Sequence, residues 1–180
     1  MVTELPPMPA CPRAAIARLN AAGYEAFAVG GCVRDALLGL PPKDWDIATM
    51  APPREVETVF ADCRVVETGL RHGTVTVLFE GKPLEITTYR VDGAYADGRH
   101  PDGVTFTPSL SEDLKRRDFT VNAMAWHPES GLFDPFDGKK DLRNGVLRCV
   151  GEATRRFNED ALRILRAFRF AAKLGFAIEP

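Results

Sequence analysis

Two aspartates one residue apart, Asp44 and Asp46, are the side chains of this 180-residue chain with the clearest chemical potential. The segment Asp44–Ala48 is predicted to form a β-strand, and residues i and i+2 of a strand point to the same side. Two carboxylates on one face suit Mg²⁺, which binds hard oxygen ligands and often takes the others from substrate phosphates. The apolar neighbours Trp45 and Ile47 argue against a merely solvated strand, because a carboxylate in apolar surroundings needs compensation. The pair therefore predicts a magnesium site.

A glycine pair, Gly30-Gly31, precedes these aspartates at a predicted junction between a strand and a helix. Residues 24–29 have the alternation of a strand, and residues 33–38 form a short helix closed by Gly39. Glycine lets the backbone approach a ligand closely, and a helix N-terminus offers free N–H groups to a phosphate. A lone Gly-Gly or Asp-x-Asp usually marks a turn or a surface strand. Together they predict a site for a nucleoside triphosphate.

A third carboxylate, Glu85, lies on the second strand of a predicted hairpin, on the face opposite to Ile86. It could join Asp44 and Asp46, or it could simply face solvent. Phosphoryl transfer with two metals needs acids that bridge ions about 4 Å apart, and a ligand from a neighbouring strand would complete such a set. We therefore count Glu85 as a candidate metal ligand.

The octet Arg116–Ala123 adds groups that could hold a triphosphate. Paired arginines can clamp phosphates through bidentate hydrogen bonds, and Asn122 could bond a ribose or hold the loop. The alternative is a pair of arginines on a solvated helix end.

Several motifs of the chain resemble those of one enzyme family. Gly-Gly followed by Asp-x-Asp resembles the signature of polymerase-β-type nucleotidyltransferases. Arg116–Ala123 resembles the second conserved motif of class II tRNA nucleotidyltransferases (the CCA-adding enzymes) and of bacterial poly(A) polymerases. Asp134–Leu142 resembles their hinge motif, and Glu159–Arg163 resembles their nucleotide-selecting motif. The resemblance covers nearly the whole chain from Phe27 onward, in the family's order.

The resemblance implies a template-independent RNA nucleotidyltransferase that uses two Mg²⁺ ions, CTP and ATP, and the 3′ end of tRNA. It implies catalytic and metal-binding roles for Asp44, Asp46 and Glu85. It implies nucleotide-binding roles for Gly30, Gly31, Arg34, Arg117, Asn122, Asp160, Arg163, Arg166 and Arg169. Within this set, Asp160 and Arg163 would read the base.

The last motif also has a physical interpretation. Asp160, Arg163, Arg166 and Arg169 follow one another every three residues, which on a helix spreads them across half of its circumference. Leu162 and Phe170 fall among these arginines, so this flank is not expected to be simply open to water. The opposite arc is apolar, with Ala161, Ile164, Leu165, Phe168 and Ala172.

Asp160 and Arg163 could select a base by hydrogen bonding. A carboxylate accepts from the amino group of cytosine or adenine, and a guanidinium donates to the ring nitrogen beside that group. Guanine and uracil present a carbonyl and an N–H there, which would leave buried groups unpaired. The chemistry therefore favours C and A.

The remaining elements predict an α/β fold: a mixed or antiparallel sheet flanked by helices, followed by the start of an all-α neck. Residues 1–12 are a flexible tail, residues 13–150 the nucleotidyltransferase head, and residues 151–180 the first, nucleotide-selecting part of the neck. Asp92–Gly103, with three glycines and few apolar residues, is predicted to be a mobile loop. The further helices and strands are predicted over residues 11–22, 52–60, 64–67, 73–79, 84–89, 111–117 and 123–126.

Composition limits the other functions. The net charge of −2 argues against a generic nucleic-acid binder, and no long apolar run indicates a membrane segment. Four scattered cysteines match neither a zinc site nor a disulfide framework, which favours a reducing cytoplasm. No protein partner is implied, and the chain resembles the amino-terminal portion of its family.

Two alternatives share these motifs, a poly(A) polymerase and an enzyme that adds only A. A non-catalytic nucleotide- or RNA-binding module is an alternative from a different class. An enzyme that adds only CC fits less well, because that subtype lacks much of the Asp92–Gly103 loop. Retention of all the metal-ligand candidates favours catalysis over simple binding.

Overall fold

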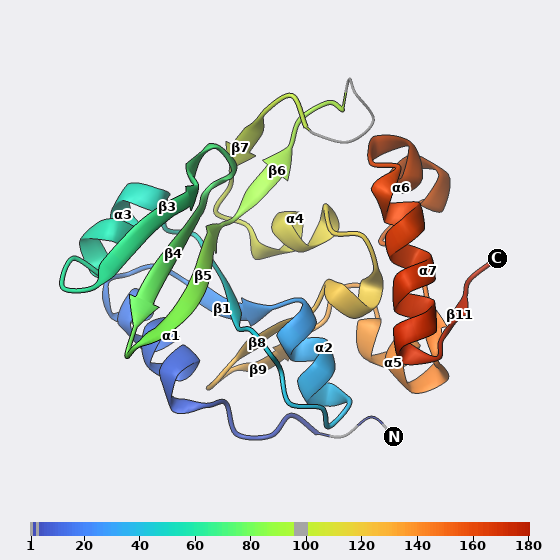
Figure 1. The fold of residues 1–180 in the computed structure, drawn as a ribbon, viewed down its shortest axis with the longest axis horizontal. Coiled ribbons are helices and arrows are strands. Elements are labelled where there is room, and N and C mark those ends of the chain that lie inside the picture. Colours follow the sequence, from blue (N-terminus) through green and yellow to red (C-terminus); the bar gives the residue numbers. More distant parts are fainter. Residues whose placement is uncertain (1, 3, 96–100) are drawn as a thin grey trace.

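A seven-stranded mixed sheet forms the centre of the computed structural model, which describes residues 2, 4–95 and 101–180 (Figure 1). Its strand order is β3-β4-β5-β2-β1-β8-β9. The strands are β1 (Ala26–Val29), β2 (Asp46–Thr49), β3 (Arg64–Gly69), β4 (Thr74–Phe79), β5 (Lys82–Thr88), β8 (Ala125–His127) and β9 (Gly131–Phe133). β2 and β5 pair in parallel, and the other neighbours pair antiparallel. The predicted mixed sheet with helices is confirmed.

Helices and two small strand pairs complete the fold. The helices are α1 (Ala10–Ala21), α2 (Gly31–Leu37), α3 (Pro53–Val59), α4 (Leu110–Lys115), α5 (Gly138–Asn144), α6 (Ala153–Glu159) and α7 (Leu162–Leu174). Short 3₁₀ turns cover Leu70–His72 and Thr120–Asn122. The small pairs are β6 (Arg90–Asp92) with β7 (Val104–Phe106), and β10 (Val146–Leu147) with β11 (Ala177–Ile178).

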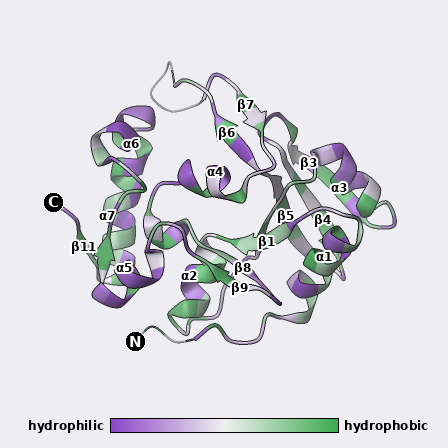
Figure 2. Ribbon diagram, turned by 180° about the vertical axis from the view of Figure 1, so that it is seen from behind, coloured by the Kyte–Doolittle hydropathy of each residue, from purple (hydrophilic) through white to green (hydrophobic). Residues whose placement is uncertain are grey.

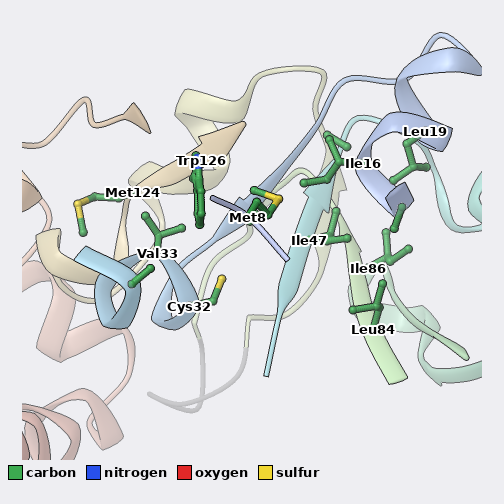
Figure 3. Close-up of a cluster of buried hydrophobic side chains, with 14 of the residues drawn as sticks. Met8, Ile16, Leu19, Cys32, Val33, Ile47, Leu84, Ile86, Met124 and Trp126 are labelled. Carbon is green, nitrogen blue, oxygen red and sulfur yellow. The ribbon is translucent and has the colours of Figure 1, made fainter. Parts of the chain in front are cut away.

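One face of the sheet packs against α1 and α3. Alternate residues of β4 and β5, including Val77 and Ile86, are buried, and they belong to one apolar cluster with residues of α1 and with Phe60 after α3. Figure 3 shows Ile86 in this cluster with Ile16 and Leu19 of α1. Burial of each such side chain contributes about 1.5–3 kcal/mol. The alternation places their neighbours on the other face of the sheet, and on β5 that neighbour is Glu85.

The other face is covered only in part. A second cluster there joins Val29 of β1, Ala48 of β2 and Leu114 of α4. The packing of α4 on this face holds the end of the sheet at which β1 runs into Gly30 and β2 begins at Asp46.

Several predicted elements agree with the structure to within one or two residues, including the hairpin of β4 and β5. Its two-residue turn, Glu80-Gly81, has positive φ at both positions, as a tight hairpin of this twist requires. Two of the shifted boundaries bear on the site: α2 begins at Gly31 rather than at Val33, and β2 begins at Asp46 rather than at Asp44. Asp44 therefore precedes the strand instead of lying in it.

The sequence analysis missed β9 and α5, and also the short strands β6, β7, β10 and β11. The sequence of α5 is polar, so it lacks a helical apolar period; Asp134 instead accepts the N–H groups of Gly138 and Lys139 at its start. Gly138 lies so close to the Thr120 carbonyl that a Cβ would be 2.3 Å from its oxygen. Tertiary packing, rather than local pattern, fixes this segment.

The prediction of one helix through Asp160 is wrong. α6 ends at Glu159, and Asp160 has extended backbone angles (φ −145°, ψ 104°) before α7 begins at Leu162. Its Oδ1 accepts the Leu162 N–H at 2.9 Å, so Asp160 caps the second helix. The three arginines alone share α7.

The ends of the predicted loop are held together by the pairing of β6 with β7. The Gly93 N–H donates to the Gly103 carbonyl (2.8 Å), and the Asp102 N–H donates to that of Ala94 (2.7 Å). Residues 96–100, on which the prediction of mobility mainly falls, lie outside the described residues.

No helix within the described residues is both long and apolar enough to span a membrane. All four cysteines are free, as their spacing predicts: Cys11, Cys32 and Cys149 are buried and Cys63 is half-buried.

Candidate functional site

The structure places two of the three predicted carboxylates side by side. Asp46, the first residue of β2, is in register with Glu85 on the parallel neighbour β5. Asp44 lies two residues before the strand and is exposed. Burial, followed by repulsion from Glu85 and Asp44, raises the pKa of Asp46 above its ordinary value, although Arg117 opposes this shift. The site therefore carries negative charge that a cation would relieve.

Within the described residues, these three carboxylates are not close enough together to bind one metal ion as a set. The same is true there of every other group of three Asp, Glu, His or Cys side chains. Asp46 is nevertheless in register with Glu85 and has a raised pKa. Two such acids side by side fit a site for a cation with oxygen ligands better than they fit an ordinary solvent-facing strand.

Gly30 makes the sharp turn between β1 and α2. Its backbone angles, φ 76° and ψ −126°, are accessible to glycine and strained for other residues. A Cβ at this position would lie 3.0 Å from Nη1 of Arg117 and 3.7 Å from the Asn122 carbonyl oxygen. Gly30 thus brings the backbone directly against the octet Arg116–Ala123.

Replacing Gly30 with alanine is expected to lower the free energy of unfolding by about 1–3 kcal/mol, because the new side chain strains the turn. Gly31→Ala is the matched control: Gly31 has ordinary helical geometry, and a Cβ there would lie 3.6 Å from its nearest neighbour, Nη2 of Arg34. Urea denaturation of both variants measures the difference. Equal loss in the two variants would contradict the backbone argument.

Arg34 and Asn122 form a buried hydrogen-bonded pair between α2 and the octet. Nη1 of Arg34 donates to Oδ1 of Asn122 at 2.5 Å, and Nε donates to Asp35 at 2.8 Å. The Arg34 guanidinium also lies over the ring of Phe170 on α7, 5.2 Å from its centroid. Asn122 therefore holds the loop, one of the two roles that the sequence allowed; the contact leaves its proposed bond to a ribose untested.

Two aspartates that the sequence analysis did not select organise the arginines. Asp113, fully buried on α4, accepts hydrogen bonds from Arg116 (2.7 and 3.0 Å) and Arg117 (3.1 Å). Asp118 accepts from Nδ2 of Asn122 (3.2 Å) and Nε of Arg166 (2.7 Å). Burial pushes the pKa of Asp113 upward, but Arg117 and Arg116 outweigh burial and hold that pKa below its ordinary value.

The arginine side of α7 faces the rest of the domain. Arg163 is 6% exposed and Phe170 is 6% exposed, whereas Leu165 and Phe168 are 65% and 63% exposed. The guanidinium groups of Arg166 and Arg169 lie 5.4 and 5.1 Å from the Phe170 ring centroid. Figure 2 shows both hydrophilic and hydrophobic residues along this helix. The expectation that the arginine flank is not simply open to water is thus confirmed for Arg163.

Arg163 already has protein partners. Nη1 donates to Glu159 (2.9 Å) and to the Arg156 carbonyl (3.3 Å), and Nη2 donates to the Arg116 carbonyl (3.3 Å) and the Tyr95 hydroxyl (3.5 Å). Its Nε lies 4.0 Å from Oδ2 of Asp160. Arg163 is therefore held rigidly at the wall of the site, with Asp160 beside it.

A cavity of about 610 Å³ gathers most of these groups. Ten of the twelve predicted residues line it, and the exceptions are Asp44 and Glu85. The predicted lining residues are Gly30, Gly31, Arg34, Asp46, Arg117, Asn122, Asp160, Arg163, Arg166 and Arg169. The other lining residues are Arg116, which the sequence offered as one half of the arginine pair, and Asp118, Leu162, Phe170 and Lys173, to which it gave no role. The position of Phe170 among the arginines was a usable signal; no pattern singled out Lys173.

The cavity combines a carboxylate edge at Asp46, a glycine turn, and arginines on α2, the octet and α7, a lining that suits an anionic ligand with a bound cation. Residues 26–148 match the model of the poly(A) polymerase head domain. The chain belongs to this family.

Relatives of this head domain are CCA-adding enzymes. That of Lactiplantibacillus plantarum is 52% identical over 179 residues, which cover 99% of this chain and 44% of the relative. The solved CCA-adding enzyme of Bacillus stearothermophilus, in complex with CTP, is 47% identical with a TM-score of 0.86, over 94% of this chain and 40% of that one. The Thermotoga maritima enzyme, complexed with tRNA, is 30% identical with a TM-score of 0.75, over 93% and 38%. The chain thus spans less than half the length of these relatives.

Proposed function

We propose that the protein carrying this chain adds C and A nucleotides from CTP and ATP to the 3′ end of tRNA. The observation that carries the proposal is the arginine-lined cavity that meets the Asp46–Glu85 pair at one edge. The similarity to CCA-adding enzymes supports it. A poly(A) polymerase is the second candidate, because the family's head domain bears that name. Cytoplasmic action, in keeping with four free thiols, is part of the proposal.

Asp46 and Glu85, with Asp44 from the preceding loop, would hold two Mg²⁺ ions. Bound there, the ions would activate the RNA 3′-hydroxyl and neutralise charge on the departing pyrophosphate. The chain's own groups position the reactants. Arg34, Arg117, Arg166 and Arg169 would bind phosphates and sugar, with Gly30 and Gly31 leaving room for them.

Asp113 and Asp118 would act through the arginines. Asp113 fixes the direction of Arg117, and Asp118 fixes that of Arg166, so both guanidinium groups are oriented before a nucleotide arrives. Preorganised donors lose less freedom on binding than mobile surface arginines do.

Asp160 and Arg163 would read the base at the α6–α7 junction, the part of the chain that we assign to the start of the neck. Oδ1 of Asp160 is used by the Leu162 N–H, which leaves Oδ2 beside Arg163 to accept the amino group of cytosine or adenine. Guanine and uracil would present a carbonyl to that oxygen, which is repulsive.

Labelled CTP and ATP offered to the complete protein with tRNA that lacks its 3′ terminus test this function. Incorporation that requires Mg²⁺ and stops on its removal with EDTA is the expected result. Binding of nucleotide without incorporation would instead show a non-catalytic module.

Asp160→Asn separates base reading from helix capping. Asparagine is as good a cap as aspartate, so α7 should remain intact, while its NH₂ group replaces the acceptor that faces the base. We expect incorporation of CTP and ATP to fall about 10- to 100-fold relative to UTP and GTP, since a good base contact is worth about 1–3 kcal/mol. Kinetics with each of the four nucleotides measure this ratio.

Asp160→Ala is the companion variant, because it removes both the cap and the acceptor. If Asp160→Asn rejected UTP and GTP as strictly as the wild type, the base-reading role would be wrong. Asp160 would then serve only to cap α7 and orient Arg163.

A further inference from the structure

Beyond the carboxylates, one face of strands β3, β4 and β5 is open. Val66 of β3 and Leu78 of β4 are 41% and 43% exposed, and Arg64 and Pro83 beside them are exposed as well. The opposite side of the same strands carries buried residues such as Val77 and Ile86, which pack against the α1 and α3 layer. We call the exposed set Arg64, Val66, Leu78 and Pro83 the strand platform; the half-buried Thr76 lies between Val66 and Glu85 in the sheet.

The register of the strands connects this platform to the carboxylates. Asp46 pairs with Glu85, Glu85 with Thr76, and Thr76 with Val66, so the four form one row across the sheet. The next row joins Pro83, Leu78 and Arg64. Paired residues of neighbouring strands share a face, so the platform begins where the carboxylates end.

The nucleotide cavity lies on the other side of Asp46. Its lining comes from the β1–α2 turn, the octet and α7, and it includes neither Glu85 nor any platform residue. In phosphoryl transfer the attacking and leaving oxygens are roughly in line across the reacting phosphorus. A nucleotide held in the cavity, with its reacting phosphate at Asp46, therefore leaves the β5–β4–β3 side for the attacking group.

We propose that the strand platform binds the single-stranded 3′-terminal nucleotide of the RNA acceptor, with Val66, Leu78 and Pro83 against its base and ribose and Arg64 near its phosphate. The inference rests on the proposed function and adds the position of the second substrate. Apolar side chains suit a sequence-independent contact with a base, and one cation at the rim suits a backbone phosphate. The platform thus aims the terminal hydroxyl at Asp46 and Glu85.

Two substitutions of Leu78 test the platform in the complete protein. Leu78→Glu and Leu78→Lys change the same exposed position by opposite charges, so the fold should tolerate both alike. We expect Leu78→Glu to raise the KM for RNA about tenfold through repulsion of phosphate and loss of the apolar contact, and Leu78→Lys to change it by less than about threefold. The KM for CTP should not change in either variant. Phe133→Ala, an exposed apolar change at the far edge of the same sheet, is the control.

Each other outcome overturns a specific statement. If the KM for RNA stayed unchanged in Leu78→Glu while the wild type extended RNA normally, the platform would be wrong and the proposed function would stand. Equal impairment by Leu78→Glu and Leu78→Lys would indicate a structural effect and would also overturn the platform. Failure of the wild type to extend RNA at all would overturn the proposed function and the platform with it.

Discussion

Replacing Asp46 with asparagine is expected to reduce nucleotide incorporation by about a thousandfold or more, since stabilisation by a bound metal is worth several kcal/mol. Of the three carboxylates, only Asp46 lines the cavity, and it also lies in register with Glu85 on β5. Its loss should therefore affect both the nucleotide and the RNA. All four nucleotides should be affected alike, in contrast to the Asp160 variants.

The same substitution should leave the fold intact or stabilise it. The pKa of Asp46 is raised in the folded protein, so its ionised form costs stability at neutral pH, and a neutral asparagine removes that cost. Thermal denaturation without metal measures this effect beside the kinetics. Glu129→Gln, a change of an exposed acid in the β8–β9 turn, is the control. Near-normal turnover of Asp46→Asn would refute the metal assignment.

Asp113→Asn should cause the largest loss of stability among single polar substitutions in this site. It leaves Arg116 and Arg117 without their buried counter-charge, and breaking a buried ion pair in this way costs about 3–5 kcal/mol. Nucleotide incorporation should also fall, because Arg117 lines the cavity. Urea denaturation measures the first effect, and Glu112→Gln, at the exposed neighbour on α4, is the control.

The Asp113 effect should depend on pH with a definite sign. The pKa of Asp113 is lowered by folding, so its contribution is complete above the unfolded pKa of about 4 and is lost as pH falls through the folded value. The difference in unfolding free energy between wild type and Asp113→Asn should therefore be constant near pH 7 and shrink below about pH 4. A difference that stayed constant down to pH 2 would contradict the ion-pair explanation.

The sequence predicted those parts of the fold that rest on local pattern. Strands β4 and β5 alternate clearly, and the Glu80-Gly81 turn joins them at the predicted place. The helix α5 has no such pattern, since its start depends on Asp134 and its packing on Gly138 beneath Thr120. The break between α6 and α7 was missed because the residues on both sides of it favour a helix. The hydrogen bond from the Leu162 N–H to Asp160 determines where the second helix begins.

The candidate site was predicted mainly from motif resemblance and less from the physical properties of its residues. Residues that contact a ligand directly carry a recognisable pattern, which explains why ten of the twelve predicted residues line one cavity. Asp113 and Asp118 act through other side chains, and an aspartate next to arginines looks in sequence like an ordinary solvated acid. Their importance follows from burial, which only the tertiary structure reveals.

Sequencing the 3′ ends of tRNA after reaction with the complete protein, CTP and ATP tests the proposed activity most directly. Starting from tRNA that lacks its terminal nucleotides, we expect C-C-A to be added once and synthesis to stop. Tails of A alone would identify a poly(A) polymerase or an enzyme that adds only A. Unchanged 3′ ends, despite bound CTP, would contradict nucleotidyl transfer by this site.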